Sequence, residues 1–302
     1  MSHAEPMVQP DFIAMVDEKY SLPLFTSIKQ SLKYYPHSHF YVYDCGLEQS
    51  TVAELTVISP QVHVIQWTLE YLPITVGYDR AFVRMKALGM LRDVVKSYFT
   101  GTFVNKSLRS FERQQRFEVV IQNKLRVMQH HNETVGRPFI FIDADAFLID
   151  RIDELLDGSY DVGFTVRPKT KHSYAYNRCA LLFAGIMWFM GNQKTNQIFF
   201  DQWFSEARQC TELWSEQTSL ARWLHRLQPD IFDTIGATHT ITIHNTPVRI
   251  RTLDADVYNN THIDEYEKTA VPENVKVLHF KNNRFTTPQF ATIAKQLNIE
   301  TR

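Results

Sequence analysis

Two aspartates follow a continuous apolar run in the stretch FIFIDADAFLID, residues 139–150. Asp143 and Asp145 are two positions apart, so an extended chain points both side chains to the same side. Burying a carboxylate without a partner is costly, and two neighbouring carboxylates repel each other. No Lys or Arg follows them until Arg151. We therefore expect a bound divalent cation as their partner, and carboxylate oxygens suit Mg²⁺ or Mn²⁺.

Asp-x-Asp spacing alone is weak evidence for a metal site, and other roles stay open. The acids could cap a helix expected near Asp150, or they could lie in solvent. The same tripeptide recurs at Asp254 and Asp256, within TLDADVYNN. Because turn-forming polar residues surround this second copy, where the first copy follows an apolar strand, we expect a mostly structural role for it.

Two metal-dependent chemistries place acids after an apolar strand. In a phosphatase of the haloacid-dehalogenase type the first Asp is a nucleophile. That type of site wants a Thr or Val two residues after the second Asp, where this chain has Phe147. In nucleotide-sugar transfer, the acids hold a metal ion that grips a diphosphate leaving group.

The elements expected around the acids alternate between strands and helices. Short β-branched or aromatic runs predict strands, and helical spacing of apolar residues predicts helices. In the first part of the chain we expect strand 12–16, helix 22–35, strand 39–44, helix 49–58 and strand 62–67. This order predicts an α/β fold with a mostly parallel central sheet flanked by helices, which binds ligands beyond the carboxyl ends of its strands.

The rest of the chain continues this pattern without a repeat or a linker. We expect a helix at 79–99, strands at 139–143 and 162–166, helices at 195–207 and 215–227, strand material at 241–253 and a last strand at 275–280. In the apolar run CALLFAGIMWFM, the pair Ala184-Gly185 indicates a tight turn or a close backbone approach before a further strand. A single domain over residues 1–302 is the resulting prediction.

A helical insertion is expected at about 101–137. Its apolar positions keep a helical period, and its cations are assigned to the other face: Lys106, Arg109, Arg113, Arg116, Lys124 and Arg126. A solvated helix packed on the core is the favoured interpretation. The alternative is a basic surface for an anionic acceptor or for a membrane.

Composition limits the classes of partner. The chain has 302 residues, 44% of them hydrophobic, and a formal net charge of -1, so it can bury a core and has no bulk field that attracts nucleic acid. Three cysteines without paired spacing fit a reducing compartment. No apolar run approaches the length of a membrane span. We expect a cytoplasmic protein, with peripheral membrane contact through 101–137 left open.

Several stretches together resemble the glycosyltransferases of the GT-A fold, in particular family eight and its relatives. The matching stretches, in order, are AMVDEKYSLPLFTSIKQSL, HFYVYDCGL, FVRMKALGML, FIFIDADAFLIDRIDELL, FAGIMWFMGN, EQTSL and VKVLHF. Two positions depart from the family pattern. Phe183 stands where the family usually has Asn before the Ala-Gly pair, and the closing motif HFKNNRFTT lacks the usual Gly and Lys.

The resemblance implies a metal-dependent enzyme that moves a sugar from a nucleotide-diphosphate donor, a UDP-sugar, to a hydroxyl of a glycan, lipid or protein with retention of configuration. It implies that Asp143, Asp145 and His279 hold Mn²⁺ or Mg²⁺. The donor would lie against Asp17 and Tyr20 at the base, and against Arg84, Ala184 and Gly185 near the sugar and diphosphate. Glu216 and Gln217 would lie under the reacting anomeric carbon.

Some of these roles have plain structural alternatives. Lys281 and Arg284 could neutralise the leaving diphosphate in place of the missing Lys, as cations do where phosphate charge develops. His279 could instead be a hydrogen-bonded core histidine, Tyr20 a packing aromatic, and Glu216 a favourable acid at a helix N-terminus. The altered positions keep two alternatives open: a metal-dependent phosphatase or nucleotide hydrolase, and a catalytically silent nucleotide-sugar binder.

Overall fold

The computed structural model describes residues 9–69, 106–167, 182–210, 215–266, 268–281 and 284–300, with the side chains of the helix at 106–134 described from residue 119 onward. The expected helix at 79–99, with Arg84, lies outside the described residues. No helix in the described ranges combines the length and apolar character needed to cross a membrane.

The N-terminal part alternates strands and helices as expected. Its elements are β1 (Asp11–Val16), η1 (Glu18–Tyr20), α1 (Ser21–Tyr34), β2 (Phe40–Asp44), α2 (Gln49–Ile58) and β3 (Val62–Gln66). All three strands are parallel neighbours in the order β3-β2-β1. The predicted strand-helix order is confirmed here because each element carries its own local signal.

The remaining elements begin with a long helix. They are α4 (Lys106–Thr134), β4 (Phe139–Ile142), β5 (Ala146–Leu148), η2 (Asp153–Leu155), β6 (Val162–Val166), β7 (Leu182–Phe189), α5 (Gln193–Arg208), α6 (Ser215–Leu227), β8 (Thr238–Ile243), β9 (Thr246–Asp254), α7 (Ala255–Tyr258), β10 (Val277–His279), η5 (Arg284–Thr286) and α8 (Pro288–Gln296). The expected helix after Asp150 is only the short 3₁₀ turn η2, and the strand β5 was not expected.

The central sheet is mixed, which corrects the expectation of a mostly parallel one. Its order is β3-β2-β1-β4-β7-β6-β9-β8. β7 lies between β4 and β6 and runs antiparallel to both, and β8 is antiparallel to β9. A buried strand has the same apolar composition in either direction, so its sequence could not reveal this reversal. β7 continues through Ala184-Gly185 without a turn, but its pairing with β6 shifts there, because Phe164 lies opposite Met187 and Thr165 lies opposite Phe183.

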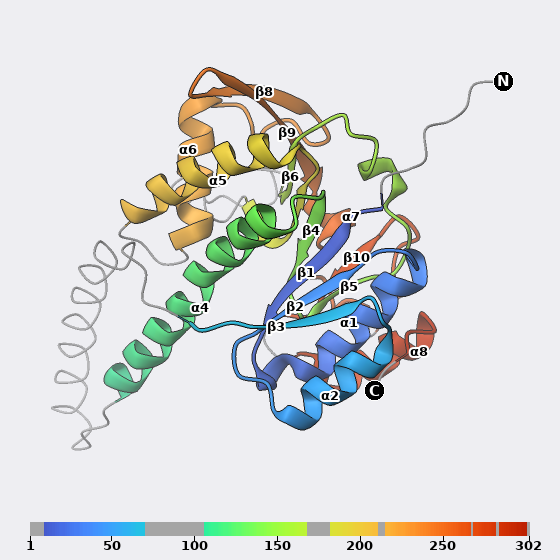
Figure 1. Cartoon of the computed structure of the whole chain (residues 1–302). Coiled ribbons are helices and arrows are strands. Elements are labelled where there is room, and N and C mark those ends of the chain that lie inside the picture. Colours follow the sequence, from blue (N-terminus) through green and yellow to red (C-terminus); the bar gives the residue numbers. More distant parts are fainter. Residues whose placement is uncertain are drawn as a thin grey trace, which may run out of the picture.

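Helices cover both faces of this sheet (Figure 1). Alternate residues of one strand face opposite sides: Ile13 and Phe141 pack in the cluster that includes α4, α5 and α6, whereas Phe12 and Ile140 pack in the cluster that includes α1. A separate two-stranded sheet of β5 and β10 lies beside α1 and α8. The carboxyl ends of β1, β4 and β6 lie at one edge of the sheet, because these three strands run in the same direction.

Candidate active site

The two acids of the first Asp-Ala-Asp tripeptide link β4 to β5. The Asp143 amide donates to the Gly185 carbonyl at 2.7 Å, which extends the β4–β7 ladder by one position. The Ala146 amide then donates to the Asp143 carbonyl at 2.9 Å, so the chain turns and enters β5. Asp145 is 7% exposed, and Asp143 is half-buried.

The antiparallel ladder of β5 and β10 brings His279 to these acids. His279 lies opposite Ala146, and the Phe280 amide donates to the Asp145 carbonyl at 2.8 Å. His279 Nε2 is 3.1 Å from Asp145 Oδ1 and 3.8 Å from Asp143 Oδ2. The three side chains each offer one ligand atom, and these atoms lie within 4.8 Å of one another.

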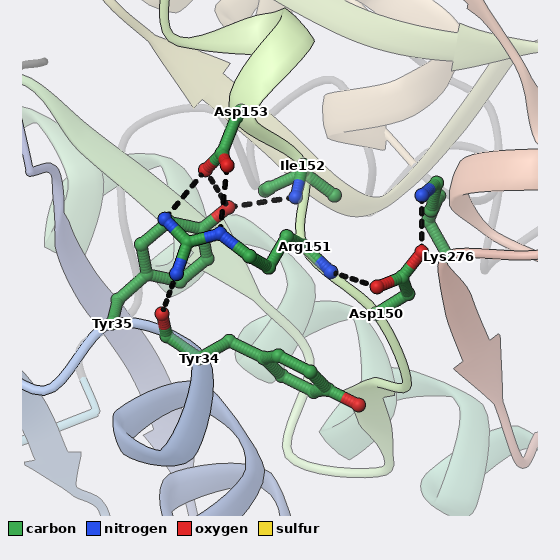
Figure 2. Close-up of polar contacts among 7 residues, drawn as sticks. All are labelled: Tyr34, Tyr35, Asp150, Arg151, Ile152, Asp153 and Lys276. Carbon is green, nitrogen blue, oxygen red and sulfur yellow. Dashed lines mark hydrogen bonds and ion pairs between the residues drawn. The ribbon is translucent and has the colours of Figure 1, made fainter.

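A polar network fixes the chain on the far side of β5 (Figure 2). The Arg151 guanidinium donates to the Asp153 carboxylate through Nε and Nη2, and to the Tyr34 carbonyl through Nη1. The Tyr35 hydroxyl donates to Asp153 and accepts from the Ile152 amide. These contacts hold the segment that follows β5 against the C-terminal end of α1.

A second anchor holds the start of β10 beside the end of β5. The Lys276 ammonium pairs with the Asp150 carboxylate, and the Ile149 amide donates to the Lys276 carbonyl at 2.8 Å. The ladder register is thereby fixed at both ends, and a one-residue slip would turn His279 away from the acids.

A chain of hydrogen bonds sets the tautomer of His279. The Thr165 hydroxyl donates to the Phe183 carbonyl at 3.0 Å, so it accepts from Asn259 Nδ2 at 2.9 Å. Asn259 Oδ1 is then the acceptor that faces His279 Nδ1 at 2.8 Å. His279 therefore carries a proton on Nδ1, and its Nε2 is directed toward Asp145.

The tautomer of His279 indicates whether these three side chains can bind a cation. In neutral His279, Nε2 carries a lone pair, and it faces the Asp145 carboxylate oxygen at 3.1 Å. Two acceptors this close repel each other unless a proton or a metal ion lies between them. Carboxylate oxygens and an imidazole nitrogen held by a hydrogen bond on its other nitrogen are a donor set that divalent metals use. The residues present therefore fit the expected metal.

Lys124 is a residue of the candidate site that the sequence interpretation did not include. It was assigned to the solvated face of the helix, but its ammonium lies 2.5 Å from Asp143 Oδ1 and its side chain is only 17% exposed. Burial alone lowers the pKa of Lys124, but the charges of Asp143 and Glu216 outweigh this and leave the pKa above its usual value. Asp143 thus has a protein cation as partner, which corrects the expectation that none was near. The spacing could have shown that Lys124 shares the core-facing side of the helix, because it follows Ile121 by three positions and precedes Met128 by four, but it could not have shown that Asp143 is its partner.

Gly185 allows His279 to approach the acids. A Cβ at this position would lie 2.4 Å from His279 Cε1, which no side chain could occupy without displacing the ring. The same position is 3.3 Å from Asp143 Oδ2. Of the two expectations for the Ala184-Gly185 pair, the close backbone approach is confirmed.

Glu216 and Gln217 lie at the start of α6, close to β7. Glu216 is 3% exposed, and its carbonyl accepts from the Trp203 indole at 2.9 Å. The Ala184 amide points at Gln217 Oε1 at a long 3.4 Å. Since the charge of Glu216 also acts on Lys124, this helix start and the metal-site acids are neighbours.

Asp17 and Tyr20 flank the acids on the β1 side. Asp17 is exposed just beyond β1, and the Tyr20 amide donates to its carbonyl at 3.0 Å. Burial raises the pKa of the Tyr20 hydroxyl, and the charges of Asp145, Asp17 and Asp143 raise it further. The Tyr20 hydroxyl therefore lies within the field of the acids, while its ring packs against Phe285 at 5.7 Å.

The predicted cations of the closing motif differ in their surroundings. Lys281 lies with its ammonium 4.1 Å from the centroid of the Phe183 ring. Burial lowers the pKa of Lys281 to about 8, although Asp143 acts in the opposite direction. Arg284 pairs with Asp264 at 2.8 Å. The structure thus brings Lys281 to the acids and gives Arg284 a surface partner.

The second Asp-Ala-Asp tripeptide has the structural role that its sequence predicted. Asp254 is the N-cap of α7, and its side chain accepts from the Asp256 amide. Asp256 Oδ1 lies 3.2 Å from His262 Nε2. No metal-ligand group that includes these two acids occurs among the described residues.

Comparison with solved structures identifies the fold. A galactosyltransferase structure, LgtC in complex with donor and acceptor sugar analogues, matches with a TM-score of 0.52 and 11% identity over 95% of each chain. The bifunctional glycosyltransferase WbbM matches with a TM-score of 0.51 and 12% identity, over 97% of this chain and 50% of that chain. These likenesses show the GT-A fold. The search of curated proteins found no match to this sequence.

Comparison with protein-family models identifies the family. Residues 90–287, more than half of the chain, match the model described as nucleotide-diphospho-sugar transferase. The matched range contains both acids of the first tripeptide, Lys124, Glu216, Gln217 and His279. The chain therefore belongs to the nucleotide-diphospho-sugar transferase family and is a glycosyltransferase of the GT-A fold.

Proposed function

We propose that the chain transfers a sugar from a UDP-sugar to a hydroxyl acceptor with retention of configuration, with Mn²⁺ or Mg²⁺ held by Asp143, Asp145 and His279. The observation that carries the proposal is the approach of His279 Nε2 to Asp145 Oδ1 while Nδ1 is committed to Asn259. A divalent cation bound there would supply positive charge to the diphosphate as it leaves.

The chain's own residues would bind and orient the donor around that site. Tyr20 presents a half-buried ring beside Asp17, and this pair would receive the nucleotide base. Lys281, whose ammonium lies in the field of Asp143 and Asp145, would face the diphosphate oxygens. Ala184 and Gly185 would pass beneath the sugar, and Arg84 and Arg284 stay candidate donor contacts from the sequence.

Two residues near the reacting carbon distinguish stereochemical outcomes. Retention does not require a side-chain nucleophile, and Gln217 would present its amide to the sugar. Inversion needs a general base for the acceptor hydroxyl. Glu216 is the candidate base, but the backbone N–H of Gln217 donates to its Oε2 at 2.7 Å and Lys124 is a charged neighbour. NMR of the product anomer decides between the two outcomes.

The basic part of 101–137 would contact an anionic acceptor or a membrane surface. The backbone of α4 is helical from Lys106, and its N-terminal half projects past the sheet in Figure 1. Replacing Arg109, Arg113 and Arg116 by Glu should weaken transfer to the natural acceptor, more so at low salt, where screening is least. Donor hydrolysis should stay near normal, and a parallel fall in hydrolysis would contradict this role.

One assay tests the proposed function. The protein is incubated with Mn²⁺ and a panel of nucleotide sugars, and nucleoside diphosphate and free phosphate are measured separately. We expect release of UDP from one UDP-sugar, abolished by chelation and in Asp145→Asn. Release of free phosphate would identify a phosphatase or hydrolase, and donor binding without any release would identify a silent binder. Either result would overturn the proposal.

A further inference from the structure

Two loops lie side by side at the edge of the sheet that carries the candidate site. β1 and β2 are parallel neighbours, and their last residues, Val16 and Asp44, lie opposite each other. The turn η1 follows β1, with Asp17 as its N-cap and Tyr20 as its last residue. The chain that follows β2 leads into α2 through residues 45–48. Both residues proposed to meet the base therefore belong to the first loop.

The turn η1 is weakly held by its own contacts. None of the three residues Glu18–Tyr20 is buried, and Asp17 makes no side-chain hydrogen bond as the N-cap. The Tyr20 amide donates to the Asp17 carbonyl at 3.0 Å, but so short a 3₁₀ turn gains little stability from its own hydrogen bonds. A contact with a neighbouring element is therefore needed to fix the position of its backbone.

The Glu18 carboxylate makes such a contact. Its Oε1 accepts from the Ser21 hydroxyl at 3.1 Å and from the Thr51 hydroxyl at 3.0 Å. Its Oε2 accepts from the Glu48 backbone N–H at 2.8 Å. Glu48 is the N-cap of α2, and Thr51, which is 3% exposed, lies in the first turn of that helix. One side chain thus joins η1 and the start of α1 to the start of α2.

The loop that Glu18 contacts is itself fixed to the sheet. The Asp44 carboxylate accepts from the amides of Gly46 and Leu47 at 2.7 and 2.6 Å. The Cys45 amide donates to the last carbonyl of β1 at 2.8 Å, which continues the ladder between β1 and β2. The hydrogen bonds of Glu18 therefore anchor η1 to a rigid neighbour.

We propose that Glu18 is a positioning residue for the nucleotide: its carboxylate ties η1 to the start of α2 and so holds Asp17 and Tyr20 where the base would lie. Because its oxygens are engaged by α1 and α2, Glu18 acts through these two residues. A binding site needs its contacting side chains held to within about 0.5 Å. This inference rests on the proposed function, and it predicts that recognition of the base, rather than of the metal, depends on Glu18.

Calorimetric titrations of the whole chain test this role, with UDP at saturating Mn²⁺ and with Mn²⁺ alone. Glu18→Ala should weaken UDP binding about tenfold and leave Mn²⁺ affinity within about twofold, because only the base contacts lose their support. Glu18→Gln should keep most of the UDP affinity. Its amide can accept from the Glu48 N–H and donate to the two hydroxyls, which can also serve as acceptors.

A second variant tests the same contact from α2 and does not depend on the folding of Glu18→Ala. Thr51→Val removes one of the donors to Glu18 and should weaken UDP binding about threefold. Combined with Glu18→Ala, it should add no further loss, because both changes break the same contact. Additive losses would contradict a role of Thr51 through Glu18.

Asp161 provides a matched control, because its carboxylate also joins two elements, on the opposite edge of the sheet. It accepts from the Arg249 backbone N–H at 2.7 Å and from Arg249 Nη2 at 2.8 Å. Asp161→Ala and Glu18→Ala should both lower the unfolding temperature, but Asp161→Ala should not change UDP affinity.

Two results would overturn the inference. Unchanged UDP affinity in Glu18→Ala would leave Glu18 as a helix cap alone, and an equal fall of UDP and Mn²⁺ affinity would show general damage to the site. Failure of the wild type to bind UDP would instead overturn the proposed function, so the two failures are distinguishable.

Discussion

Two identical Asp-Ala-Asp tripeptides follow strands that end at the same edge of the sheet. The first follows β4, and the second begins on the last residue of β9. In the first, Asp143, Asp145 and His279 each offer one ligand atom, and these three atoms lie within 4.8 Å of one another. In the second, Asp254 caps α7 and Asp256 lies 3.2 Å from His262.

The difference lies in the element that each tripeptide enters. The first leads into β5, which pairs with β10, and this pairing brings His279 to the acids as a third candidate ligand from the far end of the sequence. The second leads into α7, and Asp254 is used to satisfy an amide at the helix start. The same three residues therefore form a candidate metal site before a strand and a helix cap before a helix.

The two tripeptides should differ most when the second acid of each is replaced by the uncharged Asn. Asp145→Asn should lower metal-dependent UDP release by at least about a hundredfold, because it removes a metal ligand rather than a core contact. Asp256→Asn should leave most of the activity, because its partner is the half-exposed His262. Assays of UDP release with Mn²⁺ titrations measure both. If Asp256→Asn is the inactive variant, the roles of the two tripeptides are exchanged.

The second prediction concerns the residue that orients His279. Asn259→Ala should raise the Mn²⁺ concentration needed for half-maximal activity by about 10–100-fold. Without Asn259, no hydrogen bond would hold the proton of His279 on Nδ1 and leave Nε2 free to bind the metal. Its counterpart at the other tripeptide is His262→Ala, which should not change this concentration. Calorimetric Mn²⁺ binding provides the direct measurement. Equal metal affinity of Asn259→Ala and wild type would show that His279 is oriented by other contacts.

Lys124 should act on metal affinity and turnover in opposite directions. Its ammonium competes with a divalent cation for Asp143, so Lys124→Met should bind Mn²⁺ more tightly. Turnover should fall, by about tenfold, because a positive charge near the leaving diphosphate is lost. Without metal the variant should also unfold at a lower temperature, and added Mn²⁺ should restore much of the loss. A joint fall of metal affinity and turnover, in a folded variant, would contradict this competition.

The smallest effect is expected at the cap of the second tripeptide. Asp254→Ala should lower the free energy of unfolding by about 1 kcal/mol, whereas Asp254→Asn should change it little, because Asn is an equally good N-cap. Urea unfolding measures both, and metal-dependent turnover of the folded protein should survive in each. A loss of turnover in the well-capped Asp254→Asn would indicate a functional charge at this position.

Most local elements could be predicted from the sequence. The range of α2 is the expected 49–58 and that of α6 is the expected 215–227, because helical spacing of apolar residues is a local property. Asp143 and Asp145 could be chosen because two acids interrupt a buried apolar run.

Tertiary structure alone decided the direction of β7, the β5–β10 ladder and the partners of the acids. Strand direction depends on the path of the connecting chain, which the side chains of a buried strand do not encode. Lys124 reaches Asp143 across 19 positions, and Asn259 orients His279 across 20. Such contacts join residues whose own sequence neighbourhoods carry no sign of each other, because they exist only once the helix and the strands have packed.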